Sequence, residues 1–253
     1  MLPENAVLHI VIFIFGLCFG SFFNVVTDRL PRHESIVTVK SHCESCGYDL
    51  KWYDNIPLLS YIFLKGRCRK CQAKLSIKYP LMEIATGALF VLVFLFHGIS
   101  IESGIWCLAS GVLLTISVID WRTYEIPIGL NYFLLALGLI HLGLDYKNWF
   151  LYVIGAVSVS LLLYIIYLLS KGRAIGGGDI KLMAVMGLLL GWKLCVFGFV
   201  VGCVAGSVIH ILRMKISKAE RMLAMGPYLS AGLFLSMLVG ERFMDWYLGM
   251  LRL

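Results

Sequence analysis

The sequence predicts an all-α polytopic membrane protein with about eight transmembrane helices and a small polar loop domain between the first two. The first observation is composition: 60% of the 253 residues are hydrophobic and 15% are charged, with a mean hydropathy of +0.86. A soluble domain is about half apolar and a quarter charged, so a typical cytosolic enzyme and a disordered chain are excluded. The other two observations are the lengths of the apolar segments and the placement of the basic residues.

The apolar segments follow one another along the chain at lengths that suit membrane helices, which need about 20 mostly apolar residues. They are residues 6–26, 81–96, 104–119, 128–144, 149–170, 180–212 and 226–240. We expect helices because a lipid-exposed backbone must satisfy its own hydrogen bonds. A strand barrel would need alternating polarity, which runs such as FVLVFLF at residues 90–96 lack. The first segment has no basic n-region and no clear cleavage site, so it is expected to be an anchor with its N-terminus outside.

The basic residues set the expected orientation. Residues 28–79 hold ten Lys and Arg, and placing this loop in the cytoplasm with eight crossings puts eighteen of the twenty-two inside. Residues 180–212 must then cross twice, with two short helices or a locally thin bilayer, because 33 residues of helix span only about 50 Å, against about 60 Å for two full crossings. The apolar stretch is interrupted at Gly191, Trp192 and Lys193, and the turn is expected at Trp192 and Lys193. One long tilted helix is the alternative, and it would place residues 213–221 outside.

Two C-x-x-C pairs in the polar loop predict a metal site. The ligands are Cys43, Cys46, Cys68 and Cys71, a spacing typical of a tetrahedral zinc site. Four thiolates leave no open position, so a structural zinc is favoured, and a loop of this size needs such support. The alternatives are two disulfides, which a cytoplasmic location disfavours, and a site in which His42 replaces one cysteine. The remaining cysteines lie in apolar segments and are interpreted as small hydrophobes: Cys18, Cys107, Cys195 and Cys203.

Two aspartates are candidate catalytic residues because ionisable groups at the edge of a membrane domain are costly. Asp120 ends the third apolar segment, and Asp179 begins the sixth after Gly176–Gly178. Both are expected at the cytoplasmic edge, where a pair of carboxylates sharing one proton would activate water for acid–base chemistry. Three alternatives stay open: Asp179 only caps a helix, Asp120 only pairs with Arg122 or Lys181, and the glycines only form a flexible turn.

A resemblance to a known family rests on motifs spread over residues 16–235. They are GSFFNVV at 20–26, RLP at 29–31, the two cysteine pairs, NIPLLSY at 55–61, YPLME at 79–83, GGGD at 176–179 and MGPYL at 225–229. In this order they resemble the type IV prepilin peptidases, also called prepilin leader peptidase/N-methyltransferases. GGGD alone resembles the GxGD signature of membrane aspartyl proteases.

The resemblance implies an enzyme of the bacterial inner membrane. Such enzymes remove the basic leader of type IV prepilins or type II secretion pseudopilins after a glycine, on the cytoplasmic side. They then methylate the new N-terminal amine with S-adenosylmethionine. Asp120 and Asp179 match the two catalytic aspartates, and the four loop cysteines match the zinc motif associated with methylation. The implied partners are the prepilin or pseudopilin and membrane lipid. Nucleic acid is not expected, because the basic residues track membrane sidedness.

The resemblance divides the chain into residues 1–27 as a first transmembrane helix, 28–79 as the zinc domain and 80–253 as the peptidase domain. The residues expected to bind S-adenosylmethionine are Gly20, Asn24, Arg29, Gly66 and Glu83. The chain departs from the family at Ile128, where an aspartate is common, and at residues 173–175, which carry no acid. A peptidase without methylation and a proton-coupled transporter are the alternative functions.

Overall fold

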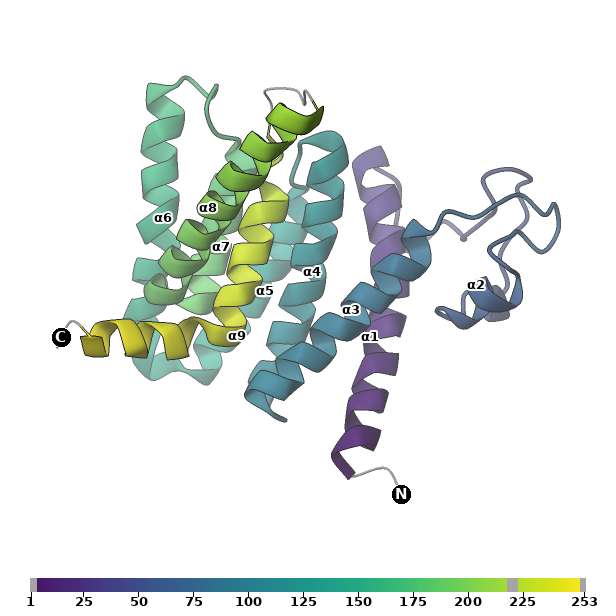
Figure 1. The fold of residues 1–253 in the computed structure, drawn as a ribbon, viewed down its shortest axis with the longest axis horizontal. Helices are drawn as coiled ribbons and strands as arrows, with labels where there is room; N and C mark the ends of the chain where they lie inside the picture. Colours follow the sequence, from purple (N-terminus) through teal and green to yellow (C-terminus); the bar gives the residue numbers. More distant parts are fainter. Residues whose placement is uncertain (1–3, 218–222, 251–253) are drawn as a thin grey trace. The chain divides into compact units, whose positions relative to one another are not determined.

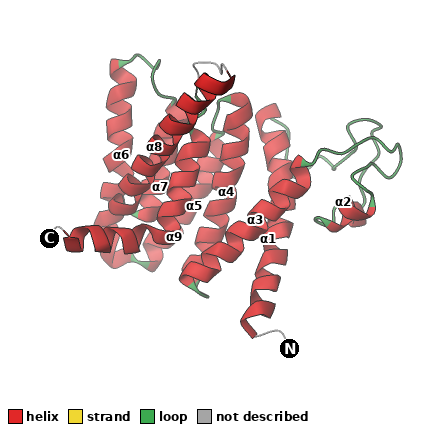
Figure 2. Cartoon of the chain, viewed as in Figure 1, coloured by secondary structure: helices red, strands yellow, loops and turns green. Residues whose placement is uncertain are grey.

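The computed structural model describes residues 4–217 and 223–250. Figure 2 shows helices joined by loops, with no strand in the part of the chain that is described, so the predicted all-α class is confirmed. The chain forms two compact units, residues 1–99 and 100–253. Lys218, Arg221 and Arg252, which entered the charge argument above, lie outside the described residues.

The first unit is built on two long helices in backbone contact, α1 (Glu4–Arg29) and α3 (Lys78–His97). A Cβ atom added to Gly16 would lie 2.6 Å from the Cα of Gly87, and one added to Gly20 would lie 2.6 Å from the Cα of Glu83. The glycines therefore allow the helices to touch, as small residues do in membrane helix pairs. The polar loop between them contains η1 (Leu30–Arg32), η2 (Trp52–Asp54) and α2 (Leu59–Phe63).

In its described residues the second unit is a bundle of six α-helices, drawn from teal to yellow in Figure 1. They are α4 (Ile101–Thr123), α5 (Ile128–Leu144), α6 (Trp149–Leu169), α7 (Gly177–Leu190), α8 (Trp192–Ser217) and α9 (Gly226–Met250), with η3 (Tyr146–Asn148) between α5 and α6. The main packed pairs are α6 with α7, α8 with α9, α5 with α7, and α4 with α9.

Two of these pairs meet at glycines. A Cβ on Gly187 of α7 would lie 2.1 Å from the carbonyl oxygen of Gly155 of α6, and a Cβ on Gly232 of α9 would lie 2.2 Å from the carbonyl oxygen of Gly198 of α8. Neither crossing leaves room for a side chain. Close backbone approach of this kind allows van der Waals packing between helices, which lack a hydrophobic driving force for association inside lipid.

Residues 180–212 form two helices, as the charge argument required. The break falls at Gly191, whose φ of +76° suits glycine, within the expected interruption at residues 191–193 and just before the expected turn at Trp192 and Lys193. Only α7 is short, at 14 residues or about 21 Å, whereas α8 has 26 residues. The expectation of two helices is therefore confirmed, the expectation that both are short is wrong for α8, and the alternative of one long helix is wrong.

Five described helices are long and apolar enough to cross a membrane: α1, α3, α4, α6 and α8, while α5 is a shorter apolar helix. Each of the eight predicted spans corresponds to one helix of the described chain. The count of eight crossings remains a prediction, as do the three predicted domains, whose boundary at residue 80 differs from the unit boundary after residue 99.

Candidate active site and metal centre

Asp120 lies in the last turn of α4, which ends where Tyr124 adopts a positive φ of 56°. Its side chain is buried, with 5% of the residue exposed. The backbone N–H of Gly226, the first residue of α9, donates a hydrogen bond of 2.8 Å to Asp120 Oδ2. A Cβ on Gly226 would lie 2.8 Å from the same oxygen, so only glycine lets this N–H approach the carboxylate.

Asp179 is the third residue of α7, which follows the N-cap Gly176. Its carboxylate accepts the backbone N–H of Gly176, the arrangement by which an acidic residue at this position satisfies the start of a helix. Gly178 packs against Ile126, whose Cβ would lie 3.0 Å from a Cβ built there. The glycine motif therefore has two structural uses, and Asp179 does serve as a helix cap.

The contact of Asp179 with the start of its own helix does not prevent it from interacting with Asp120. Asp120 and Asp179 belong to the same compact unit and lie close enough to interact electrostatically. Cys203 of α8 is also within electrostatic range of Asp179. The end of α4 and the starts of α7 and α9 thus form a polar region in an otherwise apolar bundle. A pair of interacting carboxylates can hold a single proton between them and act as acid and base on one water molecule.

The four loop cysteines converge, as predicted. All four Sγ atoms lie within 4.8 Å of one another, with Cys43 Sγ to Cys71 Sγ at 3.8 Å and Cys46 Sγ to Cys68 Sγ at 4.0 Å. A tetrahedral zinc with bonds of about 2.3 Å separates its sulfur ligands by about 3.8 Å, so the cluster fits this ion. Hydrogen bonds from the backbone N–H groups of Cys71 and Lys70 lower the pKa of the Cys68 thiol to about 7, which favours the thiolate that binds metal.

The two cysteine pairs have the same backbone conformation. The N–H of Gly47 bonds the carbonyl of Cys43, and the N–H of Gln72 bonds the carbonyl of Cys68. The residue after each pair has a positive φ, 69° at Gly47 and 59° at Gln72. Each turn is closed by an isolated β-bridge. We call these two turns the zinc knuckles, residues 42–49 and 67–74.

Asp54 ties the second zinc knuckle to the rest of the loop. Its buried carboxylate accepts the Arg69 Nε–H at 2.7 Å, and Arg69 lies over the ring of Tyr53. Burial alone would raise the pKa of Asp54, but the hydrogen bonds from Arg69 and from the Lys51 backbone N–H outweigh it and hold that pKa below its ordinary value. Sequence reasoning missed this contact, because nothing in the spacing of Asp54 and Arg69 indicates it.

The five residues expected to bind the methyl donor all lie in the first unit. Gly20 faces the backbone of Glu83, and Gly66 lies under the ring of Tyr61. Arg29 is buried and donates to the carbonyls of Ser35 and Val39. Gly20, Arg29 and Gly66 therefore make contacts with other residues of the first unit.

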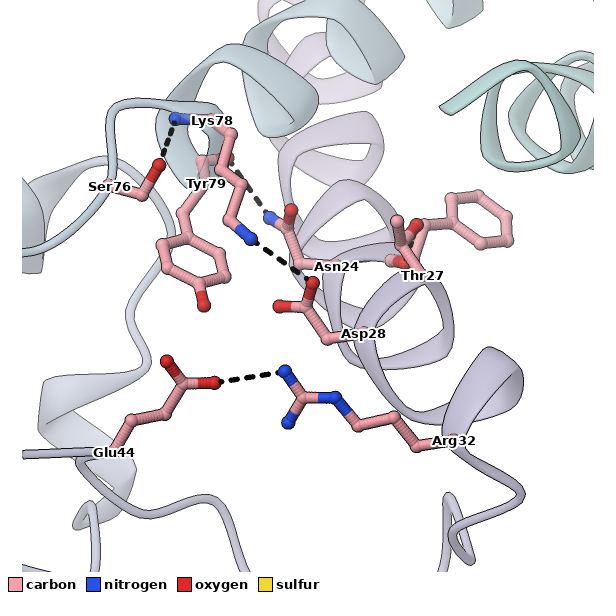
Figure 3. A network of polar contacts seen from close by, with 9 residues as sticks. Asn24, Thr27, Asp28, Arg32, Glu44, Ser76, Lys78 and Tyr79 are labelled. Atoms are coloured by element: carbon pink, nitrogen blue, oxygen red, sulfur yellow. Dashed lines mark hydrogen bonds and ion pairs between the residues drawn. The ribbon is translucent and has the colours of Figure 1, made fainter. Parts of the chain in front are cut away.

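Asn24 and Glu83 occupy neighbouring levels of the α1–α3 contact. Asn24 donates to the carbonyl of Tyr79, and Glu83 is buried and accepts the N–H of Leu58 at 2.7 Å. Figure 3 shows the polar network around Asn24, in which Lys78 pairs with Asp28, and Arg32 pairs with Glu44 at the edge of the first zinc knuckle.

A helical membrane bundle with two interacting carboxylates at its helix ends has the architecture of a membrane aspartic peptidase. The comparisons with known proteins agree. Residues 14–97 match the bacterial peptidase A24 N-terminal domain, and residues 107–211 match the type IV leader peptidase family. The chain belongs to this family of prepilin peptidases, and the transporter alternative is therefore set aside.

Several relatives are called prepilin leader peptidase/N-methyltransferase. The protein of Klebsiella pneumoniae is 42% identical over 195 residues, which cover 72% of this chain and 85% of that protein. The protein of Bacillus subtilis is 33% identical and covers 95% of this chain and 98% of its own length. The protein of Pseudomonas aeruginosa is 30% identical, with 93% and 91% covered. No solved structure matches the chain.

Proposed function

We propose that the chain is a membrane aspartic endopeptidase that removes the basic leader of a type IV prepilin or type II secretion pseudopilin after a glycine. It then methylates the new N-terminal amine with S-adenosylmethionine. The observation that carries the proposal is the electrostatically interacting pair Asp120 and Asp179, in a chain whose full-length relatives bear the name of this enzyme.

In the proposed peptidase reaction the two aspartates share one proton. The ionised carboxylate takes a proton from water as the water oxygen attacks the scissile carbonyl carbon, while the protonated carboxyl donates a hydrogen bond to the carbonyl oxygen. Collapse of the tetrahedral intermediate breaks the C–N bond, and the amine leaves with a proton from a carboxyl group. Gly226 and Gly176 hold the two carboxylates in place through their N–H groups.

We propose that the site lies at the cytoplasmic edge of the bacterial inner membrane. The basic leader would then lie in the cytosol while the apolar segment after it stays in the bilayer. The cation–π contact of Arg213 with Trp121 puts a basic residue of α8 beside the α4 end that carries Asp120, which fits the predicted sidedness. Leader lysines would be met by the exposed carboxylate of Glu125, which lies between α4 and α5 in the same unit as the two aspartates.

We propose that Cys43, Cys46, Cys68 and Cys71 hold a structural zinc ion. The ion would supply folding free energy to a loop that has little apolar core of its own. Four thiolate ligands fill its coordination sphere, so the ion has no place for substrate.

The methyl-donor site is proposed in the first unit, which carries the zinc knuckles. Asn24 and Glu83 are the candidates for contact with the donor, because a carboxylate suits its positive sulfonium and amino groups. Gly20, Arg29 and Gly66 would shape the region through the contacts described above.

Mass spectrometry tests both activities together. The purified protein is incubated in detergent or lipid with a prepilin, with and without S-adenosylmethionine. We expect loss of the leader at a glycine in both reactions, and the mass of one methyl group on the new N-terminus only when the donor is present. An intact prepilin would refute the peptidase proposal, and cleavage without added methyl would leave the peptidase-only alternative.

A further inference from the structure

One buried side-chain amide of the second unit has no hydrogen-bond partner among the described residues. Asn131 lies in the first turn of α5 with 2% of the residue exposed, and neither its Oδ1 nor its Nδ2 hydrogen-bonds any described residue. Buried polar side chains are satisfied in the great majority of cases, and an amide left unpaired is costly. An Asn with both its donor and its acceptor unused indicates a group that binds something besides the protein itself.

Two contacts place this amide relative to α7. Just before α5, Ile126 meets Gly178, and twelve residues later a Cβ on Gly138 would lie 3.5 Å from the backbone nitrogen of Leu189. The later residue of one segment, Gly138, meets the later residue of the other, Leu189. The helices α5 and α7 therefore run parallel with a fixed register. Asn131 lies between the two contact points on α5.

The register places Asn131 next to the catalytic level. Asn131 follows Ile126 by five residues and precedes Gly138 by seven, so interpolation puts it opposite Leu182. A separation of seven residues is two turns, so Asn131 and Gly138 share the face of α5 that approaches α7. Asp179 precedes Leu182 by three residues. The amide is thus about one helical turn, or about 5 Å, further along the bundle than the Asp179 carboxylate.

We infer that Asn131 binds the main chain of the substrate just after the scissile bond. This inference rests on the proposed peptidase function. A peptide that is cut must be extended at the cleaved bond, and its backbone then exposes N–H and C=O groups that no helix satisfies. A side-chain amide offers the matching acceptor and donor. The side after the scissile bond follows from depth, because the apolar part of a prepilin lies deeper in the bilayer than its leader.

The spacing also fixes which peptide group is bound. An extended chain advances about 3.3 Å per residue, so about 5 Å from Asp179 corresponds to the first or second peptide group past the cleaved bond. A chain entering here must part the start of α7 from the segment before α5. The contact to be broken is the one between Gly178 and Ile126, and the neighbouring Gly177 has nothing within 4 Å of a built Cβ.

The experiment pairs an enzyme variant with a substrate change. Synthetic prepilin segments carry single amide-to-ester replacements at each of the first four peptide groups after the scissile bond, and kcat/KM is measured with the full-length wild type, Asn131→Leu and Asn131→Ala. His141→Phe is the matched control, because His141 is another buried polar residue of α5 whose Nδ1 has no partner among the described residues, about 15 Å further along the helix.

With the wild type and His141→Phe, we expect one ester, at the first or second group, to lower kcat/KM on the order of tenfold or more. The Asn131 variants should cleave the all-amide substrate about as slowly as the wild type cleaves that ester, and should be insensitive to the ester. Unchanged kcat/KM in both variants, or variants that keep the full ester penalty, would overturn the inference. Failure of the wild type to cleave the all-amide prepilin would instead overturn the proposed function.

Discussion

The backbone N–H of Gly226 donates a 2.8 Å hydrogen bond to Asp120 Oδ2 and joins the start of α9 to the end of α4 across 106 residues of sequence. The MGPYL motif at residues 225–229, which carried only a resemblance in the sequence, thereby acquires a physical role. It brings a glycine against a buried carboxylate where a side chain would not fit.

Gly226→Ala should impair the peptidase through this contact. The new Cβ would lie 2.8 Å from Asp120 Oδ2, so the carboxylate or the start of α9 must move. Because displacements of about 1 Å cost on the order of a hundredfold in rate, we expect leader removal to fall by at least tenfold. Gly129→Ala is the control, since a Cβ there meets nothing within 4 Å. Equal activity of the two variants would show that the Gly226 contact is not needed.

Gly187→Ala should destabilise the second unit. Its Cβ would lie 2.1 Å from the carbonyl oxygen of Gly155, so α6 and α7 must separate. We expect a loss of about 3 kcal/mol of unfolding free energy, at the upper end of what overpacking costs, seen as a lower unfolding midpoint in detergent. Gly143→Ala adds a methyl group in open space and should leave the midpoint unchanged or higher. A Gly187→Ala midpoint equal to wild type would contradict the close crossing.

The two zinc knuckles predict opposite effects at equivalent positions. Gln72 adopts a φ of 59° where Gly47 of the other zinc knuckle has 69°. Because an L-residue in this conformation costs roughly 1 kcal/mol or more, Gln72→Gly should slow zinc loss to a competing chelator about fivefold, and Gly47→Ala should speed it. Metal analysis of the purified wild type is expected to find one zinc per chain. Its absence would contradict the zinc assignment, whatever the variants do.

Tyr152 and Asp145 predict a stability that depends on pH. Hydrogen bonds from Asn148 and from the Tyr152 hydroxyl, the latter at 2.7 Å, hold the pKa of Asp145 below its ordinary value. Such a carboxylate stabilises the fold above its unfolded pKa near 3.8 and loses that effect as the pH falls through the lower folded value. Tyr152→Phe should therefore unfold at a lower temperature than wild type at pH 7, with the gap closing as the pH drops below 4. If the difference in unfolding temperature persists below pH 4, the effect of Tyr152→Phe comes from packing and not from the Asp145 carboxylate.

The sequence was enough to predict the helices, because apolar length and basic loops are local signals that the bilayer imposes on the chain. It also predicted the cysteine cluster, because two residues between a pair of cysteines is the spacing that lets both thiolates bind one metal ion. The interruption at residues 191–193 was also predicted, but the turn was assigned to the polar Trp192 and Lys193, whereas the positive φ belongs to Gly191.

The long-range contacts were beyond the sequence. Spacing alone cannot say that Gly226 approaches Asp120, that Gly155 meets Gly187, or that Asn131 is left without a partner. Each follows from helix packing between segments far apart in the chain. The resemblance named Asp120 and Asp179 as a pair. The helix packing of the second unit brings them within electrostatic range of each other.

Leader removal by Asp120→Asn, Asp179→Asn and the double variant tests the central claim most directly. Residues that act as one unit are strongly non-additive. With membrane levels matched to wild type, each single variant should lose at least about a thousandfold in cleavage rate, and the double variant should be no slower than either single one. Near-normal cleavage by either single variant, or independent losses that multiply in the double variant, would contradict a shared catalytic pair.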